Sequence, residues 1–322
     1  MADDPRVRTR IDGVRAGHPV RIGLSGSRTV DYYLRAYLAD IAAAGRVGSV
    51  DRLDDVDLLF EEDDGGGAGG LLLPLRVHMV TDLAADPGDL SGVLSGEQRR
   101  QHRRRVRQLG HRYEISTRDE DFDRFYDRMY LPTMTARHGT AARTTVREAA
   151  RRDLFRHGHL MLVYADGHDE PVAGSVNHVA ESQVDARLAG VLGGAPELLA
   201  SGATKSAGHF LLAWALDHGH RRVDFQGCEP FLRKGTLQAK IDLGAGAEPA
   251  PPPLRDVRVR MSVRRDGPGV RELLRANPVV TVDAAGRLHA TAFRDGDREP
   301  APVRRPHRGL AGDTVLSLPL PS

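Results

Sequence analysis

The sequence predicts an α/β (α+β) fold in which helices flank a mixed central sheet. Short apolar runs alternate with segments of helical periodicity along most of the chain. Between residues 184 and 225, a strand, a helix and a strand follow one another, which requires a crossover connection and favours parallel pairing. The 322 residues are 40% hydrophobic and 28% charged, a globular composition long enough for one large domain or two smaller ones.

The first 95 residues predict a small mixed unit. Apolar runs indicate strands, and apolar residues three and four apart indicate one helix closed by Gly45. The expected elements are strands at 20–24, 57–61 and 71–80 and a helix at 31–44. Residues 61–70 (EEDDGGGAGG) are acidic and rich in glycine, so they predict a loop rather than part of the core.

The middle of the chain, residues 96–265, predicts the larger domain. Helices are expected at 96–112, 119–134, 146–157 and 203–218, and strands at 113–117, 160–165, 172–179, 184–192 and 222–225. The pair at 160–165 and 172–179 forms a hairpin around the Asp166–Gly167 turn. Residues 137–139 are assigned to a loop. The proline-rich segment 247–253 predicts a linker, and 257–263, which alternates apolar with basic residues, predicts an edge strand.

The last segment, 266–322, predicts a hairpin at 279–282 and 287–293 followed by a loosely ordered tail rich in proline and arginine. The chain thus divides into 1–95, 96–265 and 266–322.

Several classes of protein are excluded by composition. No apolar run is long enough to cross a bilayer and residues 1–20 lack a signal-peptide core, so we expect a cytoplasmic protein with no membrane contact. The single cysteine, Cys228, cannot form an internal disulfide and is interpreted as a packed thiol. The histidines lack metal-ligand spacing, so no metal site is predicted. The standard nucleophile-elbow, zinc-protease and phosphate-loop motifs are absent.

The helix expected at 96–112 (GEQRRQHRRRVRQLGHR) is strongly basic, and only Val106 and Leu109 offer it an apolar edge. One interpretation is a solvated surface helix. The other is a surface that faces phosphates, since arginine pairs with phosphate oxygens through two hydrogen bonds. The residues that would contact RNA in that case are Arg99, Arg100, Arg103, Arg104, Arg105 and Arg107.

The second charged feature is the distribution of lysine. The chain has only three lysines, Lys205, Lys234 and Lys240, and they fall within 36 consecutive residues. Either three rare residues cluster by chance, or lysine is kept where a rotatable ammonium is required. A strand that ends in glycines precedes the helix at 203–218, whose N-terminus attracts anions. The polar residues at that N-terminus predict either a site for a phosphate-bearing donor or an ordinary helix cap; they are Ser201, Thr204, Lys205 and Ser206.

An ordered set of motifs follows this helix. Asp224–Phe225–Gln226–Gly227 ends the next strand, Pro230–Phe231–Leu232–Arg233–Lys234–Gly235 comes after it, and Lys240 and Gly244–Ala245 close the set. With the upstream segment 125–139 (FYDRMYLPTMTARHG), these motifs resemble the Fem-like and cellulose-biosynthesis-type branch of the GNAT acyltransferase superfamily. The resemblance covers about residues 97–250 and implies a GNAT-like sheet, with residues 1–95 as a degenerate first GNAT-like half in tandem.

The resemblance implies an N-acyltransferase in which a neutral amine attacks an activated acyl group directly, without a covalent enzyme intermediate or a tightly bound cofactor. The backbone N–H groups of 189–192 would stabilise the oxyanion, and Asp224 or Glu229 would accept the amine proton, with Lys240 binding an anionic group. The donor would lie against Gly190, Val191, Leu192, Ser201, Thr204, Lys205 and Ser206. The acceptor, a small amine, would lie against Tyr130, Arg137, His138, Gln226, Arg233 and Lys234.

Three functions stay open on the sequence. The chain departs from the usual acetyl-CoA loop at Ser201–Gly208 and, where the branch has glycine, it has Gln226. Fem-like proteins also lack that loop and use aminoacyl-tRNA, which is the favoured donor here. The alternatives are an acyl thioester on CoA or on a carrier protein, and a non-catalytic RNA-binding module.

Overall fold

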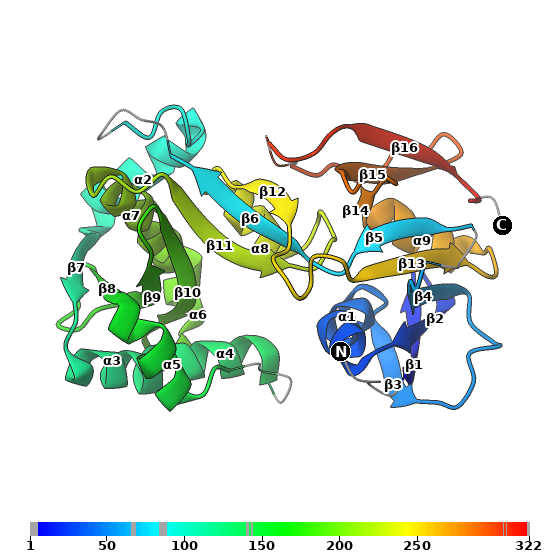
Figure 1. The fold of residues 1–322 in the computed structure, drawn as a ribbon, viewed down its shortest axis with the longest axis horizontal. Coiled ribbons are helices and arrows are strands. Elements are labelled where there is room, and N and C mark those ends of the chain that lie inside the picture. The colour runs from blue at the N-terminus through cyan, green and yellow to red at the C-terminus, as the bar shows by residue number, and fades with distance from the viewer. Residues whose placement is uncertain are drawn as a thin grey trace. The chain divides into compact units, whose positions relative to one another are not determined.

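The computed structural model describes residues 6–65, 69–83, 89–139, 142, 144–304, 306 and 308–320 (Figure 1). The chain folds into two compact units, each built from separate stretches of sequence. Unit 1 comprises Met1–His78, Gly227–Gln238 and Ala247–Ser322, and unit 2 comprises Met79–Gln226 and Ala239–Gly246. These units group the chain differently from the sequence-based boundaries, because the C-terminal residues complete the sheet that the N-terminal residues begin.

Unit 1 contains a six-stranded sheet in the order β3-β1-β2-β4-β13-β5. Its strands are β1 (Val7–Arg15), β2 (His18–Gly26), β3 (Ala44–Ser49), β4 (Leu58–Glu62), β5 (Leu71–Pro74) and β13 (Arg258–Val263). β2 and β4 are parallel, with Ile22 opposite Leu58, and the other pairs are antiparallel. Helices α1 (Arg28–Ile41) and α9 (Pro268–Ala276) contribute their apolar faces to the core of this unit.

A second, three-stranded sheet belongs to unit 1. It consists of β14 (Val279–Val282), β15 (Leu288–Asp295) and β16 (Asp313–Leu318). β14 and β15 form the expected hairpin, and β16 adds to β15 in parallel. The C-terminal segment therefore carries a regular strand where the sequence predicted a loosely ordered tail.

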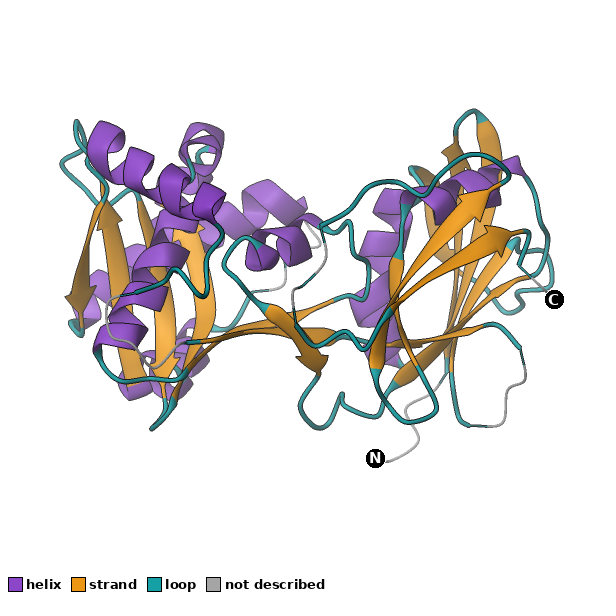
Figure 2. Cartoon of the chain, turned by 90° about the horizontal axis from the view of Figure 1, so that it is seen from above, coloured by secondary structure: helices purple, strands orange, loops and turns teal. Residues whose placement is uncertain are grey.

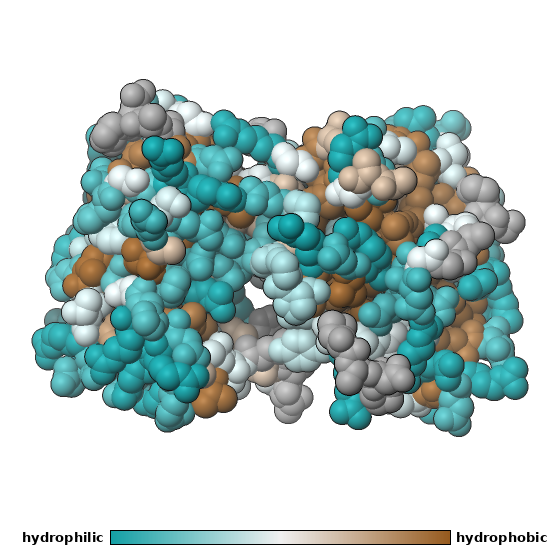
Figure 3. Space-filling view, viewed as in Figure 1, coloured by the Kyte–Doolittle hydropathy of each residue, from teal (hydrophilic) through white to brown (hydrophobic). Residues whose placement is uncertain are grey.

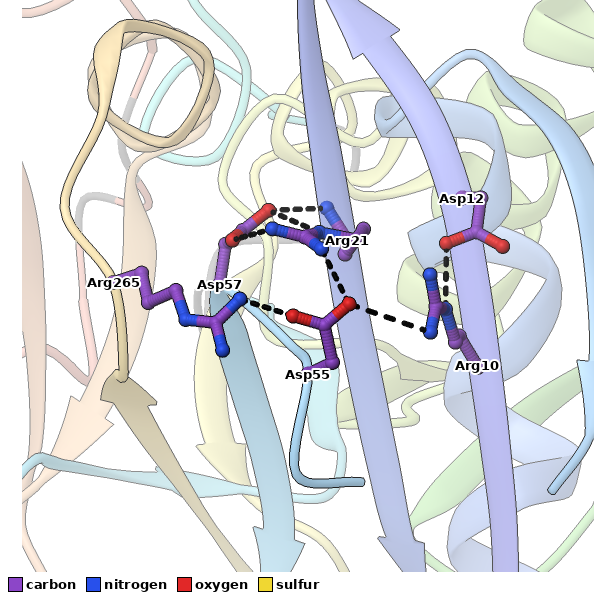
Figure 4. A network of polar contacts seen from close by, with 6 residues as sticks. All are labelled: Arg10, Asp12, Arg21, Asp55, Asp57 and Arg265. Carbon is purple, nitrogen blue, oxygen red and sulfur yellow. Dashed lines mark hydrogen bonds and ion pairs between the residues drawn. The ribbon is translucent and has the colours of Figure 1, made fainter. Parts of the chain in front are cut away.

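Charged side chains tie the strands of unit 1 together at the surface (Figure 4). Arg21 donates to Asp57 through its side chain and its backbone N–H and pairs with Asp55, which also accepts from Arg265. Arg10 lies close to the same network, 3.9 Å from Asp55. With Asp12, which pairs with Arg10, the network holds three cations and three carboxylates, so its charges balance internally.

Most of a seven-stranded sheet lies in unit 2, in the order β12-β6-β11-β10-β9-β8-β7. The strands are β6 (Val77–Asp82), β7 (Arg112–Ser116), β8 (Gly158–Tyr164), β9 (Ala173–Val179), β10 (Gln183–Val191), β11 (Arg222–Cys228) and β12 (Gly246–Pro249). β7, β8, β9 and β10 are successively antiparallel, whereas β10 and β11 are parallel, as the strand–helix–strand succession predicts.

Helices lie along this sheet (Figure 2). They are α2 (Gly96–Leu109), α3 (Asp119–Phe125), the π-helix η1 (Tyr126–Tyr130), α4 (Leu131–His138), α5 (Arg147–Asp153), the short helices η3 (Phe155–His157) and η4 (Leu192–Gly194), α6 (Pro196–Ser201), α7 (Ala203–Asp217) and α8 (Gly235–Ile241). The aromatic residues of α3 and η1 pack on Leu160, Leu162 and Val176 in a compact core. The opposite side of α3 and α5 forms a hydrophilic surface (Figure 3), laced with ion pairs such as Arg151–Asp123.

Six sequence-based assignments need correction. β1 and β3 were not expected, because β1 reads as charged and β3 is short and rich in glycine. The strand expected at 71–80 is two strands in different sheets, since Pro74 has no N–H with which to continue a ladder. Residues 257–263 form no edge strand, because β13 lies between β4 and β5 and buries Val259 and Met261.

The remaining two corrections concern helix and linker ends. The helix expected to stop at residue 134 continues through η1 and α4 to His138, so Arg137 and His138 are helical and not in a loop. The first part of the proline-rich segment is strand β12, which ends at Pro249, where the prolines begin to exclude regular pairing.

Candidate active site

The two parallel strands of unit 2 separate after three residue pairs. Gln183–Asp185 of β10 pair with Arg222–Asp224 of β11, but β10 continues to Val191 and β11 to Cys228. A register shift in β10 between Ala186 and Leu188 bends the strand at this point. The carboxyl half of β10 therefore presents an unpaired edge on the side of β11, and open parallel sheets bind their ligands at such places.

The backbone N–H groups along this edge do not all face outward. Val191 donates its N–H to Oγ1 of Thr133, on α4, at 2.8 Å, and Leu192 donates its N–H to the Val172 carbonyl at 3.0 Å. Because N–H groups alternate along a strand, Ala189 directs its N–H to the same side as Val191, away from β9. Ala189 is exposed. The sequence predicts that the N–H groups of 189–192 stabilise an oxyanion. Because the N–H groups of Val191 and Leu192 are hydrogen-bonded within the fold, we assign this role to the Ala189 N–H.

Gly190 serves packing at this edge. A Cβ built on Gly190 would lie 2.5 Å from the backbone of Met129, so only glycine lets η1 approach β10 this closely. Tyr130, expected to contact the acceptor, is buried in the same core, and its hydroxyl accepts the Thr145 N–H at 2.9 Å. The structure therefore places both residues behind the edge, where they support its position.

Three predicted residues lie together: Asp224 and Gln226 of β11 and Lys240 of α8. Asp224 is buried and its Oδ1 accepts the Gln226 N–H at 2.6 Å. Lys240, on α8, donates to the Gln226 carbonyl at 2.9 Å. Gln226 has φ = 66°, a left-handed conformation that favours glycine. This is the position at which the resembling family has glycine, and here the left-handed backbone conformation is present although the residue has a side chain. The Gln226 side chain accepts from Arg187 at 3.1 Å.

A second feature of unit 2 is the N-terminus of α7. Its N-cap, Gly202, has φ = 83° and no side chain to satisfy the free N–H groups of the first turn. The Arg105 side chain, from α2, fills the space beside it, with Nε 2.7 Å from the position a Gly202 Cβ would take. Arg105 is 9% exposed, its Nη1 has no hydrogen-bond partner among the described residues, and Nη2 reaches only Gln101, at 3.4 Å.

The burial of Arg105 explains how α2 packs. The two apolar residues expected to seat this helix, Val106 and Leu109, are each 38% exposed, whereas Gln98 and Arg105 are buried. His102 stacks on His209 of α7 with ring centroids 4.8 Å apart. Burial lowers the pKa of both His102 and His209 to about 4, so both imidazoles are neutral near pH 7. A polar, imidazole-lined contact therefore joins α2 and α7 in place of an apolar one.

A hollow of about 670 Å³ lies between α2 and the turn from α6 to α7. Its lining residues are Glu97, Arg100, Gln101, Arg104, Arg105, Gln108, Leu109, Ala200 and Ser201. The buried guanidinium of Arg105 and the positive end of the α7 dipole both face this region. Burial lowers the pKa of Arg105, because the charged form of its side chain is disfavoured away from water. An anion is the ligand that would stabilise this arrangement.

The other residues expected at the donor site have partners within the fold. Ser206 is buried with its hydroxyl 2.7 Å from Nδ1 of His111. Lys205 pairs with the buried Asp242 at 3.2 Å. Ser201 donates to the Leu198 carbonyl at 2.9 Å. Thr204 lies half-buried in the first turn of α7.

The remaining predicted residues lie in unit 1 or on the surface. Glu229 is buried and accepts a hydrogen bond from Lys234. Burial acts to raise its pKa, but the nearby charges of Lys234 and Arg76 outweigh burial and hold that pKa below its usual value. Arg233 donates to the Ala276 carbonyl at 3.2 Å. Arg137 is exposed on α4, and the side chain of His138 lies outside the described part of the chain.

Sequence reasoning missed three residues of these sites: Thr133, Asp242 and Arg76. Each lies far along the chain from its partner, so no local spacing could reveal the contact. The burial of Arg105 was equally hidden, since six arginines of one basic helix look alike in sequence. Within the described residues no cluster of three or more potential metal ligands is present, and none of the described helices is long and apolar enough to span a bilayer.

The centre of this site consists of two parallel strands that separate beyond a bulge and are joined by a crossover helix with a glycine at its N-cap. Residues 96–233 match the family model described as an acetyltransferase (GNAT) domain. The matched segment is less than half of the 322 residues.

Solved structures add likenesses at low identity. FemX is 14% identical with a TM-score of 0.43, over 75% of this chain and 85% of that one. L-PGS from Bacillus licheniformis is 11% identical with a TM-score of 0.37, over 82% and 87%. A GCN5-related N-acetyltransferase from Sphaerobacter thermophilus is 11% identical with a TM-score of 0.36, over 77% and 74%. At these values no shared function follows. No curated protein sequence matches significantly.

Proposed function

We propose that this GNAT domain is an N-acyltransferase that forms an amide bond on a small amine and takes its acyl group from aminoacyl-tRNA. The observation that carries the proposal is the buried, unsatisfied guanidinium of Arg105 at the N-terminus of α7. That position calls for an anion, and both candidate donors bring phosphate groups.

The basic face of α2 favours tRNA over a smaller donor. Arg100, Arg103, Arg104 and Arg107 are exposed on this helix beside the hollow. A nucleic acid places successive phosphates along such a surface, whereas a free coenzyme engages only one or two of these arginines. The Fem-like resemblance of the sequence implies the same donor.

The chemistry needs few groups. The amine nitrogen attacks the ester carbonyl, an N–C bond forms, the C–O bond to the ribose breaks, and the ribose hydroxyl leaves with a proton. The Ala189 N–H would donate to the developing oxyanion at the open edge of β10. Asp224 would accept the amine proton, with its carboxylate oriented by the Gln226 N–H. Lys240 would act by holding the backbone at Gln226, whose carbonyl accepts its hydrogen bond.

Glu229 is the weaker of the two predicted proton acceptors. Its carboxylate is paired with Lys234, and its lowered pKa makes it a poor base near neutral pH. We therefore assign proton transfer to Asp224 and treat Glu229 as part of a binding cluster in unit 1.

An acyl thioester is the second candidate donor. The hollow beside Arg105 is large enough for a diphosphate, and the N-terminus of α7 would receive it. A CoA or carrier-protein donor would thus use the same anion site with fewer arginines. A non-catalytic RNA-binding module would use α2 without the open edge of β10.

The donor is tested by binding to the full-length protein. Charged tRNA, uncharged tRNA and acetyl-CoA are compared by filter binding or calorimetry over a series of salt concentrations. We expect charged tRNA to bind best, with an affinity that falls steeply as salt rises. Arg105→Gln should weaken it by about tenfold or more, the effect of losing a charge-assisted contact. Arg124→Gln, an exposed arginine on α3, is the matched control and should change little.

Two results would contradict the proposal. Binding of acetyl-CoA without tRNA would move the donor to the thioester class. Equal binding of charged and uncharged tRNA, with no transfer to any amine in a mixture analysed by mass spectrometry, would indicate the RNA-binding module.

A further inference from the structure

A cluster of charged and aromatic side chains in unit 1 carries one more cation than carboxylate. Arg76, which precedes β6, and Lys234, which precedes α8, flank Glu229. Their side chains are 15%, 18% and 9% exposed, respectively. Lys234 donates to Glu229, whereas the nearest nitrogen of Arg76 is 3.6 Å from the same carboxylate. The Glu229 carboxylate therefore pairs mainly with Lys234, and the positive charge of Arg76 is not fully compensated.

The guanidinium of Arg76 lacks the hydrogen bonds that a largely buried arginine normally makes. It stacks over the Tyr33 ring at 4.4 Å, and within the described ranges it has no hydrogen-bond acceptor. Gly227 also adjoins it, since a Cβ built on Gly227 would lie 2.7 Å from Nε of Arg76. The guanidinium of Arg76 carries five N–H donors and lies against the Tyr33 ring and Gly227. The Arg76 side chain keeps 15% of its surface exposed to solvent.

The network of Figure 4 has balanced charges, whereas the cluster around Arg76 has an excess of positive charge. There, three arginines meet three aspartates, and Arg21 makes several hydrogen bonds although it is more exposed. Around Arg76, by contrast, Glu229 is the only carboxylate within ion-pair distance in the described part of the chain. Tyr37 cannot supply the charge, because burial and the nearby carboxylates raise the pKa of its phenol well above the usual value.

We propose that Arg76, with Lys234 beside it, binds the carboxylate of a small molecule. A guanidinium presents two parallel N–H donors that match the two oxygens of a carboxylate. The surplus of one positive charge suits a single negative charge, whereas a phosphate dianion would leave uncompensated charge beside Glu229.

The test uses the full-length protein with acetate and benzoate as probes, and inorganic phosphate as the competing anion. Binding is followed by calorimetry or ligand-observed NMR at constant ionic strength. We expect both carboxylates to bind better than phosphate. Arg76→Gln should weaken carboxylate binding about tenfold or more. Arg52→Gln, which removes an exposed arginine of unit 1 whose partner is Asp54, is the matched control and should bind as the wild type does.

A second variant moves binding in the opposite direction. Glu229→Gln removes the competing carboxylate and frees both cations, so acetate should bind several-fold more tightly to it. A role confined to folding would weaken binding in both variants. The proposal is overturned if neither probe binds, if phosphate binds better, if Arg76→Gln and Arg52→Gln bind alike, or if Glu229→Gln weakens binding.

Donor binding in the same variants separates this inference from the proposed function. Loss of acetate binding in Arg76→Gln with tRNA binding retained supports the carboxylate site. Loss of tRNA binding in Arg105→Gln with acetate binding retained supports two independent sites. A wild type that binds acetate but no acyl donor would contradict the proposed function and leave the carboxylate site standing.

Discussion

Replacement of Gly202 by alanine tests the link between Arg105 and the N-terminus of α7. At φ = 83° an alanine is strained, which costs roughly 1–2 kcal/mol in the free energy of unfolding. Alanine also makes the unfolded chain less flexible than glycine does, which adds about 0.4–1 kcal/mol to the free energy of unfolding. The net loss from the backbone alone is therefore about 1 kcal/mol.

The second effect of Gly202→Ala is local. The new Cβ would lie 2.7 Å from Nε of Arg105 and 3.3 Å from its Cδ and Cζ, so the guanidinium must be displaced from its present position. Loss of one charge-assisted hydrogen bond to an anion weakens the binding free energy by about 1.5–3 kcal/mol. We therefore expect the variant to bind pyrophosphate and tRNA about tenfold or more weakly.

Gly219 supplies the matched control, because it lies just beyond the other end of α7 with φ = 77° and has nothing within 4 Å of the methyl group that alanine would add. Gly219→Ala carries the same backbone strain without the contact to Arg105. Urea unfolding should show similar losses of stability in the two variants, and only Gly202→Ala should lose anion binding. Equal anion binding in the two variants would refute the assignment of Arg105 to an anion site.

Three further predictions concern the same unit. Gln226→Gly relieves the left-handed strain and should raise stability by up to about 1 kcal/mol in urea unfolding, where a lower midpoint would contradict the assigned strain. Thr133→Val removes the acceptor of the Val191 N–H and should cost about 1–3 kcal/mol, whereas Thr133→Ser, which keeps the hydroxyl, should cost clearly less. His102 and His209, with folded pKa values of about 4, bind protons more readily when unfolded, so stability should fall as pH drops from about 6.5 toward 4. The double variant with glutamine at both positions should lose less stability on acidification, and an equal loss would exclude these imidazoles as the cause.

The sequence predicts the sheet of unit 2 well because its strands are apolar and its connections are local. The hairpin of β8 and β9 and the parallel pair of β10 and β11 follow directly from spacing. The structure of unit 1 was less accessible, since β13 pairs with strands almost two hundred residues earlier, with Arg260 and Asp63 separated by 197 positions. Periodicity identifies a strand but does not name its neighbour.

The candidate sites divide in the same way. Asp224, Gln226 and Lys240 were singled out from motif order, and they meet because the first two are close neighbours in β11 and Lys240 lies on α8, the next helix. The packing of α2 through Arg105 was not accessible, because apolar periodicity pointed to Val106 and Leu109. A buried arginine in a basic helix breaks the usual pattern, and such breaks concentrate where a ligand completes the structure.

The placement of β13 has a consequence for synthesis of the chain. β4 and β5 flank β13 and are hydrogen-bonded to it, so the six-stranded sheet of unit 1 stays incomplete until residue 263 has left the ribosome. Most of unit 2, in contrast, is one continuous stretch, Met79–Gln226, and its sheet is available much earlier. Folding during translation is therefore expected to begin in unit 2, and strands β4 and β5 of unit 1 can pair with β13 only after it has been synthesised. Truncations that remove β13 should accordingly leave apolar strand edges of unit 1 uncovered and promote aggregation.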